Sequence, residues 1–409
     1  MGGAIASGAE HKPREFLLPL TERVVQGSGA LEAIATILDR YDVKAALLIA
    51  PRSLRESGLL EDLERCLGDR LAATFFDNEA HAPRRCILQA SDTARRHGVD
   101  AIVSLGGGSQ TDCAKAVALC LLQGITKEAG LDTYRVRFEY PDRLEVPSLV
   151  GKLSRLPLPI VAIPTTLSGA EFTSIFGLLD EARGVKDIFS GREFLPRAVI
   201  LDPVVTAETP ACLWASTGIK ALDHAIEGTF SSKRFPLTDA LAFGAIRALV
   251  GTLRRASADP GDIEARATCQ VAAWMSIFGL ANIGVGVSHA LGHQLGARLG
   301  IPHGITSCIT LPRAIAFNSP AVPDQLRRVG EAMGVETTAS SESSIADGVI
   351  RELESLIEDL GLPSSLRESG VSRDLLPEIA DHTLNDLVLQ TNPRPVTREE
   401  LVSLLESCW

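Results

Sequence analysis

The stretch VSLGGGSQTDCAKAVAL, residues 103–119, passes from an apolar strand pattern into a helical pattern through three consecutive glycines. Glycine has no Cβ, so Gly106, Gly107 and Gly108 let the backbone come close to a ligand. The helix that begins near Ser109 presents unpaired N–H groups and the positive end of its dipole. An ordinary tight turn is the alternative, but three glycines raise the entropy cost of folding without adding packing. The stretch therefore predicts an anion site, suited to a pyrophosphate, at the carboxyl end of a strand.

The sequence around this turn alternates apolar runs with helical periodicity. Five runs are typical of strands: VKAALLIA (43–50), LAATFFD (71–77), DAIVSLGGG (100–108), LPIVAIPTT (158–166) and RAVILDP (197–203). Helical stretches between them include GALEAIATILDRY (29–41) and CILQASDTARRHG (86–98). This alternation indicates βαβ units and a mainly parallel sheet, whose ligands bind at the carboxyl ends of the strands.

Strand patterns end near residue 204. The later segments PLTDALAFGAIRALVGTLRRA (236–256), SIADGVIRELESLIEDLG (344–361) and TREELVSLLESCW (397–409) all have helical periodicity. The predicted fold class is therefore an α/β N-terminal domain with a mainly parallel sheet, residues 1–202, followed by an all-α C-terminal domain, residues 203–409. A ligand at the carboxyl ends of the strands would face the second domain.

Composition excludes several classes of protein. The chain has 409 residues, of which 45% are hydrophobic and 22% charged, the balance of a globular protein. Its net charge of −11 repels phosphate backbones and anionic lipid, so we expect no nucleic-acid partner and no membrane partner. The eight cysteines include no CxxC pair and the N-terminus lacks a signal-peptide pattern, so we expect a reducing, cytoplasmic location. The uncharged stretch 267–297 is expected to be a helix buried inside the second domain.

Histidines gather in the second half of the chain. His289 and His293 lie four residues apart in GVSHALGHQLG, which puts them on one face of a helix. His303 follows in GIPHGITS, and His224 lies in GIKALDHAIEG (218–228), four residues after Lys220. A lone buried histidine is most often a satisfied core residue. Four together, two of them at metal-ligand spacing, favour a functional site instead.

With these motifs the chain resembles the iron-containing alcohol dehydrogenase superfamily over nearly its whole length. The matching motifs are VVQGSGALE, GGGSQTDCAK, IPTTLSGAEFT, LPRAVILDP, GIKALDHAIEG, SHALGHQLG, IPHG and NPRPVTREELVSLLE. The resemblance implies a dinucleotide-binding N-terminal domain, a helical catalytic domain, and a nicotinamide cofactor, NADH or NADPH, in the cleft between them. It also implies a homodimer.

The resemblance assigns the cofactor to named residues. They are Gly106, Gly107, Gly108 and Ser109 at the pyrophosphate, Asp112 just inside the helix, Thr165 and Thr166 along the cofactor, and Lys186 near the ribose. NAD-specific members carry an Asp after the second strand, where this chain reads APRS, with Pro51 and Arg52. Loss of that carboxylate removes repulsion of a 2′-phosphate and Arg52 would attract one, so we predict that NADPH is accepted alongside NADH.

The metal-dependent members bind iron or zinc through one Asp and three His. His224, His289 and His303 match the three histidines and would be the ligands if a metal is present, and His293 matches a further histidine near the substrate. The Asp position is Lys220 in this chain. An ammonium beside a divalent ion is repulsive by several kcal/mol even at an effective dielectric of about 20, so we expect no divalent metal.

The maleylacetate reductases are a branch of the superfamily that works without metal, and they carry Asn at that position. This chain resembles that branch in SGAEFTSIFGLLDEARGVK, LPRAVILDPVVT and SHALGHQLG. It departs from the branch in Lys220 and in a longer stretch at 124–157, which we expect to be either a cover over the cleft or a packing element. A small oxo acid such as maleylacetate is the leading substrate.

Hydride transfer to a carbonyl or to an activated double bond builds negative charge on oxygen. We predict that the Lys220 ammonium and the imidazoles of His224, His289 and His303 stabilise this oxygen in place of a metal, and that His293 or His289 supplies the proton. Such a pocket suits an anionic small molecule. Three alternatives remain: a metal-dependent alcohol dehydrogenase or aldehyde reductase with an altered ligand set, a dehydroquinate synthase-like lyase, and a non-catalytic binding protein.

Overall fold

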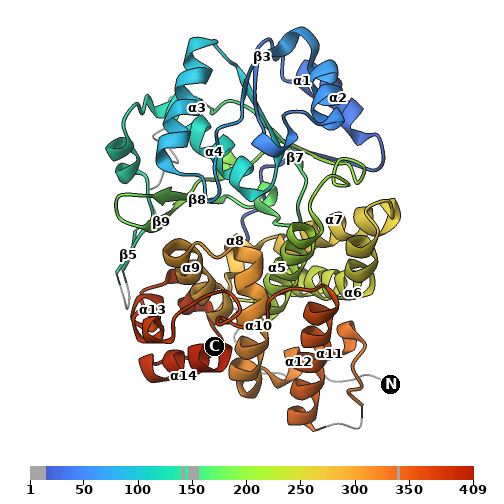
Figure 1. The fold of residues 1–409 in the computed structure, drawn as a ribbon, viewed down its shortest axis with the longest axis vertical. Coiled ribbons are helices and arrows are strands. Elements are labelled where there is room, and N and C mark those ends of the chain that lie inside the picture. Colours follow the sequence, from blue (N-terminus) through green and yellow to red (C-terminus); the bar gives the residue numbers. More distant parts are fainter. Residues whose placement is uncertain (1–14, 140–142, 146–155, 339–340) are drawn as a thin grey trace.

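A parallel sheet and a bundle of helices follow one another along the chain (Figure 1). The computed structural model describes residues 15–139, 143–145, 156–338 and 341–409. The sheet has the strand order β1-β10-β7-β4-β2-β3, and every neighbouring pair is parallel. Its strands are β1 (Arg23–Gln26), β2 (Ala46–Ile49), β3 (Leu71–Phe75), β4 (Ala101–Gly106), β7 (Ile160–Pro164) and β10 (Ala198–Leu201). The five predicted strands and the fold class are confirmed.

Helices cover both faces of this sheet. In β2, Leu47 and Ile49 pack into the cluster that contains Ile87 of α3, whereas Leu48 packs on the other face with Ile34 of α1. Successive strand residues point to opposite faces, so an unbroken apolar run is what a sheet buried on both sides requires. The covering elements are η1 (Ala30–Ala33), α1 (Ile34–Arg40), η2 (Arg52–Leu54), α2 (Gly58–Leu67), η3 (Gly68–Arg70), α3 (Arg84–Arg96) and α4 (Gly108–Gln123).

Two antiparallel hairpins lie beside the parallel sheet, and neither was predicted from the sequence. One consists of β8 (Ile175–Asp180) and β9 (Val185–Ser190), flanked by η5 (Ala170–Phe172) and η6 (Arg192–Phe194). The other belongs to the long stretch 124–157, where η4 (Glu128–Thr133) precedes β5 (Arg137–Glu139) and β6 (Arg143–Glu145). The N–H of Val136 donates to the carbonyl of Ile188 at 2.7 Å, so this stretch is attached to the edge of β9.

The chain changes from sheet to helices between β10 and α5. The helical elements are α5 (Ala211–Phe230), α6 (Pro236–Ala258), α7 (Ile263–Ile277), α8 (Leu280–Ile283), α9 (Val287–Leu299), α10 (His303–Asn318), η7 (Ser319–Ala321), α11 (Pro323–Met333), α12 (Glu342–Asp359), η8 (Arg373–Leu375), α13 (Leu376–Thr383), η9 (Leu387–Thr391) and α14 (Arg398–Cys408). Most of them share one hydrophobic core, in which α5 is buried along most of its length.

The uncharged stretch 267–297 is buried in this domain as expected, but it is not one helix. It contains most of α7, then α8 and most of α9, and the chain bends by 99° between α7–α8 and α9. Gly279 and Gly284 take positive φ values of 75° and 72° at the ends of α8, which explains where the helix breaks. By length and composition α6 could cross a membrane, and 44% of its apolar window is buried in this fold.

Candidate active site and cofactor cleft

A cleft of about 930 Å³ lies between the carboxyl ends of the sheet strands and the helices α5, α9 and α10. The structure brings all five predicted catalytic residues to it: Lys220, His224, His289, His293 and His303. Seven of the predicted cofactor residues line it as well, namely Gly107, Gly108, Ser109, Asp112, Thr165, Thr166 and Lys186. Gly106 and Arg52 do not line the cleft.

The glycine turn leaves little room for side chains. A Cβ added to Gly107 would lie 3.1 Å from the Cγ2 of Thr166. Gly106 has a φ of 136°, a conformation that other residues rarely adopt, and its carbonyl accepts a hydrogen bond of 2.9 Å from the N–H of Thr165. The turn after β4 is therefore fixed against the turn after β7, and α4 begins at Gly108 with its N-terminus at the cleft. This arrangement fits a pyrophosphate.

Hydroxyl groups beside the turn also fit a ligand. The Oγ1 of Thr166 and the Oγ of Ser168 are buried and have no hydrogen-bond partner among the described residues. Ser109 accepts a hydrogen bond of 3.1 Å from the N–H of His81 and keeps its own hydroxyl hydrogen for a ligand. Buried polar groups normally have partners, so unpartnered hydroxyls at this turn are what a cofactor site requires.

Asp112 and Lys186 face one another at the wall of the cleft. The Lys186 Nζ lies 3.9 Å from the Asp112 Oδ2, which also accepts a hydrogen bond of 3.2 Å from the N–H of Gly177. Burial raises the pKa of Asp112, and Lys186 and Lys115 oppose that rise. A Cβ on Gly177 would overlap the Lys186 side chain, at 2.2 Å from its Cε. Because Gly177 has no Cβ, the Lys186 side chain can lie against β8 in the β8–β9 hairpin.

Arg52 lies outside the cleft in an exposed ion pair. Its guanidinium is 2.6 Å from the Asp77 carboxylate, and its side chain is 71% exposed. Its neighbours Pro51, Ser53 and Leu54 line the cleft instead. The prediction that Arg52 attracts a 2′-phosphate therefore requires that Arg52 exchange Asp77 for the ligand.

Helix α5 carries four polar residues on one face, and sequence reasoning identified only two of them. Lys220 and His224 reach the cleft, whereas Asp223 and Glu227 lie behind it. The Lys220 Nζ is 3.4 Å from the Asp223 Oδ2, which also accepts hydrogen bonds from the hydroxyls of Ser307 (2.6 Å) and Ser288 (3.1 Å). Burial lowers the pKa of Lys220, and Asp223 and Glu227 oppose that effect. The spacing i, i+3, i+4, i+7 was visible in the sequence as one helix face.

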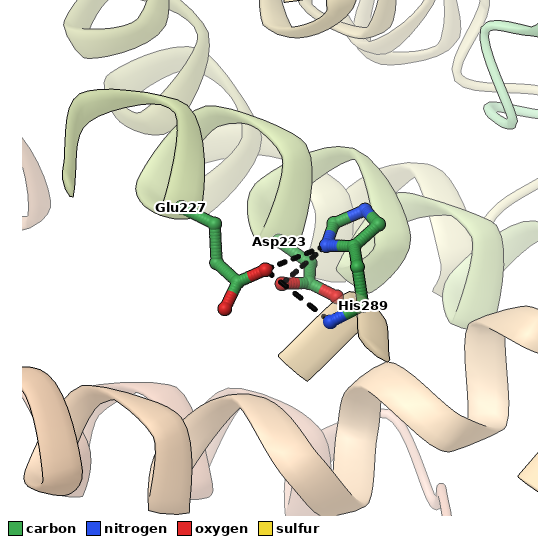
Figure 2. A group of neighbouring side chains, drawn as sticks. All are labelled: Asp223, Glu227 and His289. Atoms are coloured by element: carbon green, nitrogen blue, oxygen red, sulfur yellow. Dashed lines mark hydrogen bonds and ion pairs between the residues drawn. The ribbon is translucent and has the colours of Figure 1, made fainter. Parts of the chain in front are cut away.

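Glu227 fixes both the start of α9 and the orientation of His289. It accepts hydrogen bonds from the backbone N–H groups of Gly286 (2.9 Å), Ser288 (2.8 Å) and His289 (3.3 Å). The His289 Nδ1 lies 2.8 Å from the same carboxylate, and Figure 2 shows the other ring nitrogen pointing away from it. Burial, and then the charge of Asp223, raises the pKa of Glu227 to about 8, whereas the three backbone N–H groups favour its carboxylate form. As a carboxylate, Glu227 keeps the hydrogen of His289 on Nδ1, so that Nε2 presents a lone pair.

A second histidine–carboxylate pair was also missed. The His293 Nδ1 lies 2.8 Å from the Oδ2 of Asp386, a residue 93 positions later in the chain. Asp386 also caps η9 by accepting a hydrogen bond of 3.1 Å from the N–H of Val388. No spacing rule links Asp386 to His293, since they meet only through the packing of α9 on η9.

Three imidazole nitrogens near the cleft are buried without hydrogen-bond partners. The Nδ1 atoms of His224 and His303 and the Nε2 of His289 have no hydrogen-bond partner among the described residues. The rings of His224 and His289 stack with centroids 5.1 Å apart, and those of His293 and His303 meet edge to face at 5.6 Å. Burial lowers the pKa of His289 to about 3 and holds the pKa of His224 and of His303 well below the usual range. These three rings are neutral at pH 7.

The three histidines named as ligands if a metal is present, His224, His289 and His303, do not form one group of neighbouring ligand atoms among the described residues. Among the described residues, two groups bring three ligand atoms within 4.8 Å of one another, and neither contains His224 or His303. One is Asp223, Glu227 and His289 (Figure 2), whose carboxylates already accept the hydrogen bonds described above. The other is Asp132, Asp180 and Asp187, whose three carboxylates form ion pairs with Arg84, Arg135 and Arg183. Lys220 pairs with Asp223 of the first group, and an ammonium at this place repels a divalent ion, so that group does not fit a divalent metal.

Two further residues line the cleft, His81 and Val136. His81 lines it from the sheet domain, with its backbone in the left-handed region at φ 63°. Val136, from the stretch 124–157, lines it next to β9. The same stretch buries Leu131 completely in the sheet-domain core, so its described part both packs and borders the cleft. Residues 140–142 and 146–155 lie outside the described residues.

Comparison with known proteins gives the family. The family "Iron-containing alcohol dehydrogenase" matches residues 21–203, and the family "Fe-containing alcohol dehydrogenase family, C-terminal" matches residues 214–409. The NAD-dependent methanol dehydrogenase of Bacillus methanolicus is 30% identical, with 94% of this chain and 97% of that protein covered. The maleylacetate reductase of Sphingobium indicum is 30% identical, with 95% of each chain covered. The crystal structure of a 1,3-propanediol oxidoreductase superposes with a TM-score of 0.86 at 27% identity, covering 97% of this chain and 100% of that one. The chain belongs to the iron-containing alcohol dehydrogenase family, in which it is similar to the maleylacetate reductase branch, and it is an NAD-dependent oxidoreductase.

Proposed function

We propose that the enzyme reduces a small oxo acid with NADH or NADPH, as a maleylacetate reductase-like enzyme, and does so without a divalent metal. The observation that carries this proposal is the Lys220 ammonium, which lines the cleft beside His224 and is paired with Asp223. It stands where metal-dependent relatives carry an Asp ligand. A fixed cation in a low-dielectric site stabilises developing negative charge in the way a Lewis acid does.

The residues of the cleft divide the reaction between them. When bound, the nicotinamide supplies a hydride to the carbonyl carbon of the substrate. Lys220 faces the carbonyl oxygen, which gains negative charge in the transition state, and the neutral rings of His224 and His303 each offer an N–H group. His289 stays neutral and keeps its hydrogen toward Glu227. His293 is therefore the better proton donor of the two considered, because Asp386 holds its Nδ1 at 2.8 Å and so orients the ring in the cleft.

The role of Lys220 is tested with a charge-balanced pair of variants. Lys220→Met leaves Asp223 buried without its cation, and this alone could disturb the site. The double variant Lys220→Met/Asp223→Asn removes both charges and keeps the packing. We expect at least about a hundredfold loss of kcat in both, the scale of one oxyanion donor. Recovery of kcat in the double variant would show that Lys220 only neutralises Asp223. Lys44→Met, at an exposed lysine far from the cleft, is the control.

The substrate class is tested by NADH and NADPH oxidation with a panel of oxo acids and matched uncharged aldehydes. We expect kcat/KM to be higher for the oxo acids, since Lys186 and Lys220 both line the cleft. A preference for the aldehydes would contradict the proposed substrate. Failure of any carbonyl compound to oxidise the cofactor would instead favour a lyase of the dehydroquinate synthase type or a non-catalytic binding protein.

A metal-dependent alcohol dehydrogenase or aldehyde reductase is the second candidate. The grouping of Asp223, Glu227 and His289 within 4.8 Å favours it, and the relationship to a methanol dehydrogenase is consistent with it. The pairing of Asp223 with Lys220 and of Glu227 with the start of α9 counts against it.

All eight cysteines are free thiols, which supports the proposal of a cytoplasmic enzyme. A homodimer remains a prediction.

A further inference from the structure

His81 holds a backbone conformation that most residues avoid. Three non-glycine residues of the described chain have positive φ: Asp42 (55°), His81 (63°) and Ala82 (49°). The left-handed region is sterically unfavourable for residues with a Cβ, and such strain is found where the surrounding structure imposes it, often at functional sites. A glycine at position 81 would relieve it, so the presence of a histidine requires another reason.

The backbone of His81 is fixed from two sides. Its N–H donates to the hydroxyl of Ser109 in the glycine turn at 3.1 Å. Its carbonyl accepts a hydrogen bond of 3.1 Å from the N–H of Leu179 in β8. The residue is thus held between the turn that fits the pyrophosphate and the hairpin that carries Lys186.

The imidazole of His81 faces the cleft. Its ring makes no hydrogen bond to any described residue, and the residue lines the same cleft as the helical-domain histidines. The ring centroids of His81 and His303 are 6.5 Å apart in an edge-to-face arrangement, although the two residues belong to different domains. Burial, and then the charge of Lys186, lowers the pKa of His81, so the ring is neutral at pH 7 and keeps one N–H to donate.

We propose that His81 is a substrate-binding residue, whose imidazole N–H donates a hydrogen bond to a carboxylate of the oxo acid and so holds the substrate between the two domains. This inference rests on the proposed function, because it assigns a residue to the carboxylate of that substrate class. The surroundings of the ring support it: Lys186 lines the same cleft, and its charge, after burial, lowers the pKa of His81. Lys220 lines the same cleft from the helical domain. An anionic group at this point would meet the Lys186 cation and a free N–H group.

Glycine substitution separates the strain from the imidazole. His81→Gly removes the ring while relaxing the backbone, and Asp42→Gly relaxes the same kind of backbone at an exposed turn as the matched control. We expect both variants to fold and to keep or gain thermal stability. His81→Asn tolerates positive φ and restores a side-chain donor, so it should recover part of any loss.

Two readouts make the result decisive. The first is kcat/KM for the preferred oxo acid, which we expect to fall at least about tenfold in His81→Gly, mainly through KM, as for a lost hydrogen bond to a charged group. The second is the Kd of malonate, a dicarboxylate probe, for the enzyme–NADPH complex, which should weaken by a similar factor. The Kd of NADPH alone should stay within about twofold, because His81 contacts the turn only through its backbone.

The outcomes distinguish this inference from the proposed function. If His81→Gly binds malonate and reduces the oxo acid as well as the unmodified enzyme does, His81 is only a turn residue and the inference is overturned. If the unmodified enzyme reduces no oxo acid, the proposed function fails. The Kd of malonate for the unmodified enzyme and for His81→Gly then still decides whether His81 binds a carboxylate. Equal loss of NADPH and malonate binding would also overturn it, since the defect would then lie in the glycine turn.

Discussion

At the scale of single residues, the pairing of Lys220 with Asp223 explains how a cation is kept in a buried helix. A lysine side chain that is 9% exposed loses most of its hydration, and the fully buried carboxylate three residues later compensates for that loss. Ser288 and Ser307 donate to the Oδ2 atom of the same carboxylate, whereas its Oδ1 atom is buried without a hydrogen-bond partner among the described residues. The sequence identified Lys220 as a candidate catalytic residue. It did not show that Asp223 turns toward it.

Arg52 should control the choice between the two cofactors. It is held by Asp77 rather than by the cleft, so we expect Arg52→Ala to lower kcat/KM for NADPH by about tenfold, the loss of one charge-assisted contact, with little change for NADH. Asp77→Asn should do the opposite by releasing the guanidinium. Steady-state kinetics with both cofactors check this, and Arg65→Ala, at another exposed arginine, is the control. Equal effects on NADH and NADPH would contradict the assignment.

Asp386 should position His293 without contacting the cofactor. Asp386→Asn removes the carboxylate that holds the His293 Nδ1 at 2.8 Å. We expect kcat to fall about 10–100-fold, within the range for general acid–base groups, while the KM for the cofactor is unchanged. Asp381→Asn, which breaks the exposed pair with Arg398 away from the cleft lining, is the control. An unchanged solvent isotope effect and kcat in Asp386→Asn would exclude a role for this pair.

At the scale of elements, close packing of α5 on α10 sets the distance between His224 and His303. A Cβ on Gly304 would lie 2.6 Å from the backbone of Ser216, so α10 must move if this glycine is replaced. We expect Gly304→Ala to lower the free energy of unfolding by about 1–3 kcal/mol and to lower kcat. Gly251→Ala in α6 meets nothing within 4 Å and should raise stability by about 0.5–1 kcal/mol. Urea unfolding of both variants tests this, and equal stability would show that the contact has no cost.

The second cofactor turn contains a carboxylate that should make stability depend on pH. Burial raises the pKa of Glu171 to about 7, against the opposing effects of its own backbone N–H and of Lys115. The folded state therefore binds a proton more tightly than the unfolded state, whose pKa is 4.5. This contribution to stability is fully present below pH 4.5 and is lost as the pH rises through 7.

Glu171→Gln removes this dependence. We expect the variant to match the unmodified enzyme near pH 4.5 and to be more stable at pH 8, by up to about 3 kcal/mol for a shift of that size. Denaturant unfolding across this range measures the difference, and Glu358→Gln, at an exposed position of α12, should show none of it. A difference in the free energy of unfolding that is the same at all pH values would contradict the raised pKa of Glu171.

Periodicity predicted the regular elements, and its failures have physical causes. Helical periodicity predicted the helices α6, α12 and α14, and short apolar runs predicted the buried strands of the sheet. The hairpin β8–β9 was missed because its strands are only partly buried and include charged residues such as Lys186 and Asp187. The break between α7 and α9 was missed because glycine is also tolerated inside helices. Asp386 and His81 reach the site through tertiary contacts, which no local pattern encodes.

At the scale of the whole molecule, the site exists only where the two domains meet. The sheet domain contributes the glycine turn, Lys186 and His81, and the helical domain contributes Lys220 and the remaining histidines. The net charge of −11 repels anions at long range, so binding of an anionic substrate depends on the local cations inside the cleft. This separation explains how an acidic enzyme can bind an anionic cofactor and an anionic substrate together.

The most direct test of the account is the metal content of the purified enzyme, measured by elemental analysis together with kcat before and after exhaustive chelation. We predict far less than one iron or zinc per chain and no loss of kcat, because the Lys220 ammonium supplies the positive charge. One metal per chain, with activity that is lost on chelation and restored by the same ion, would contradict the account.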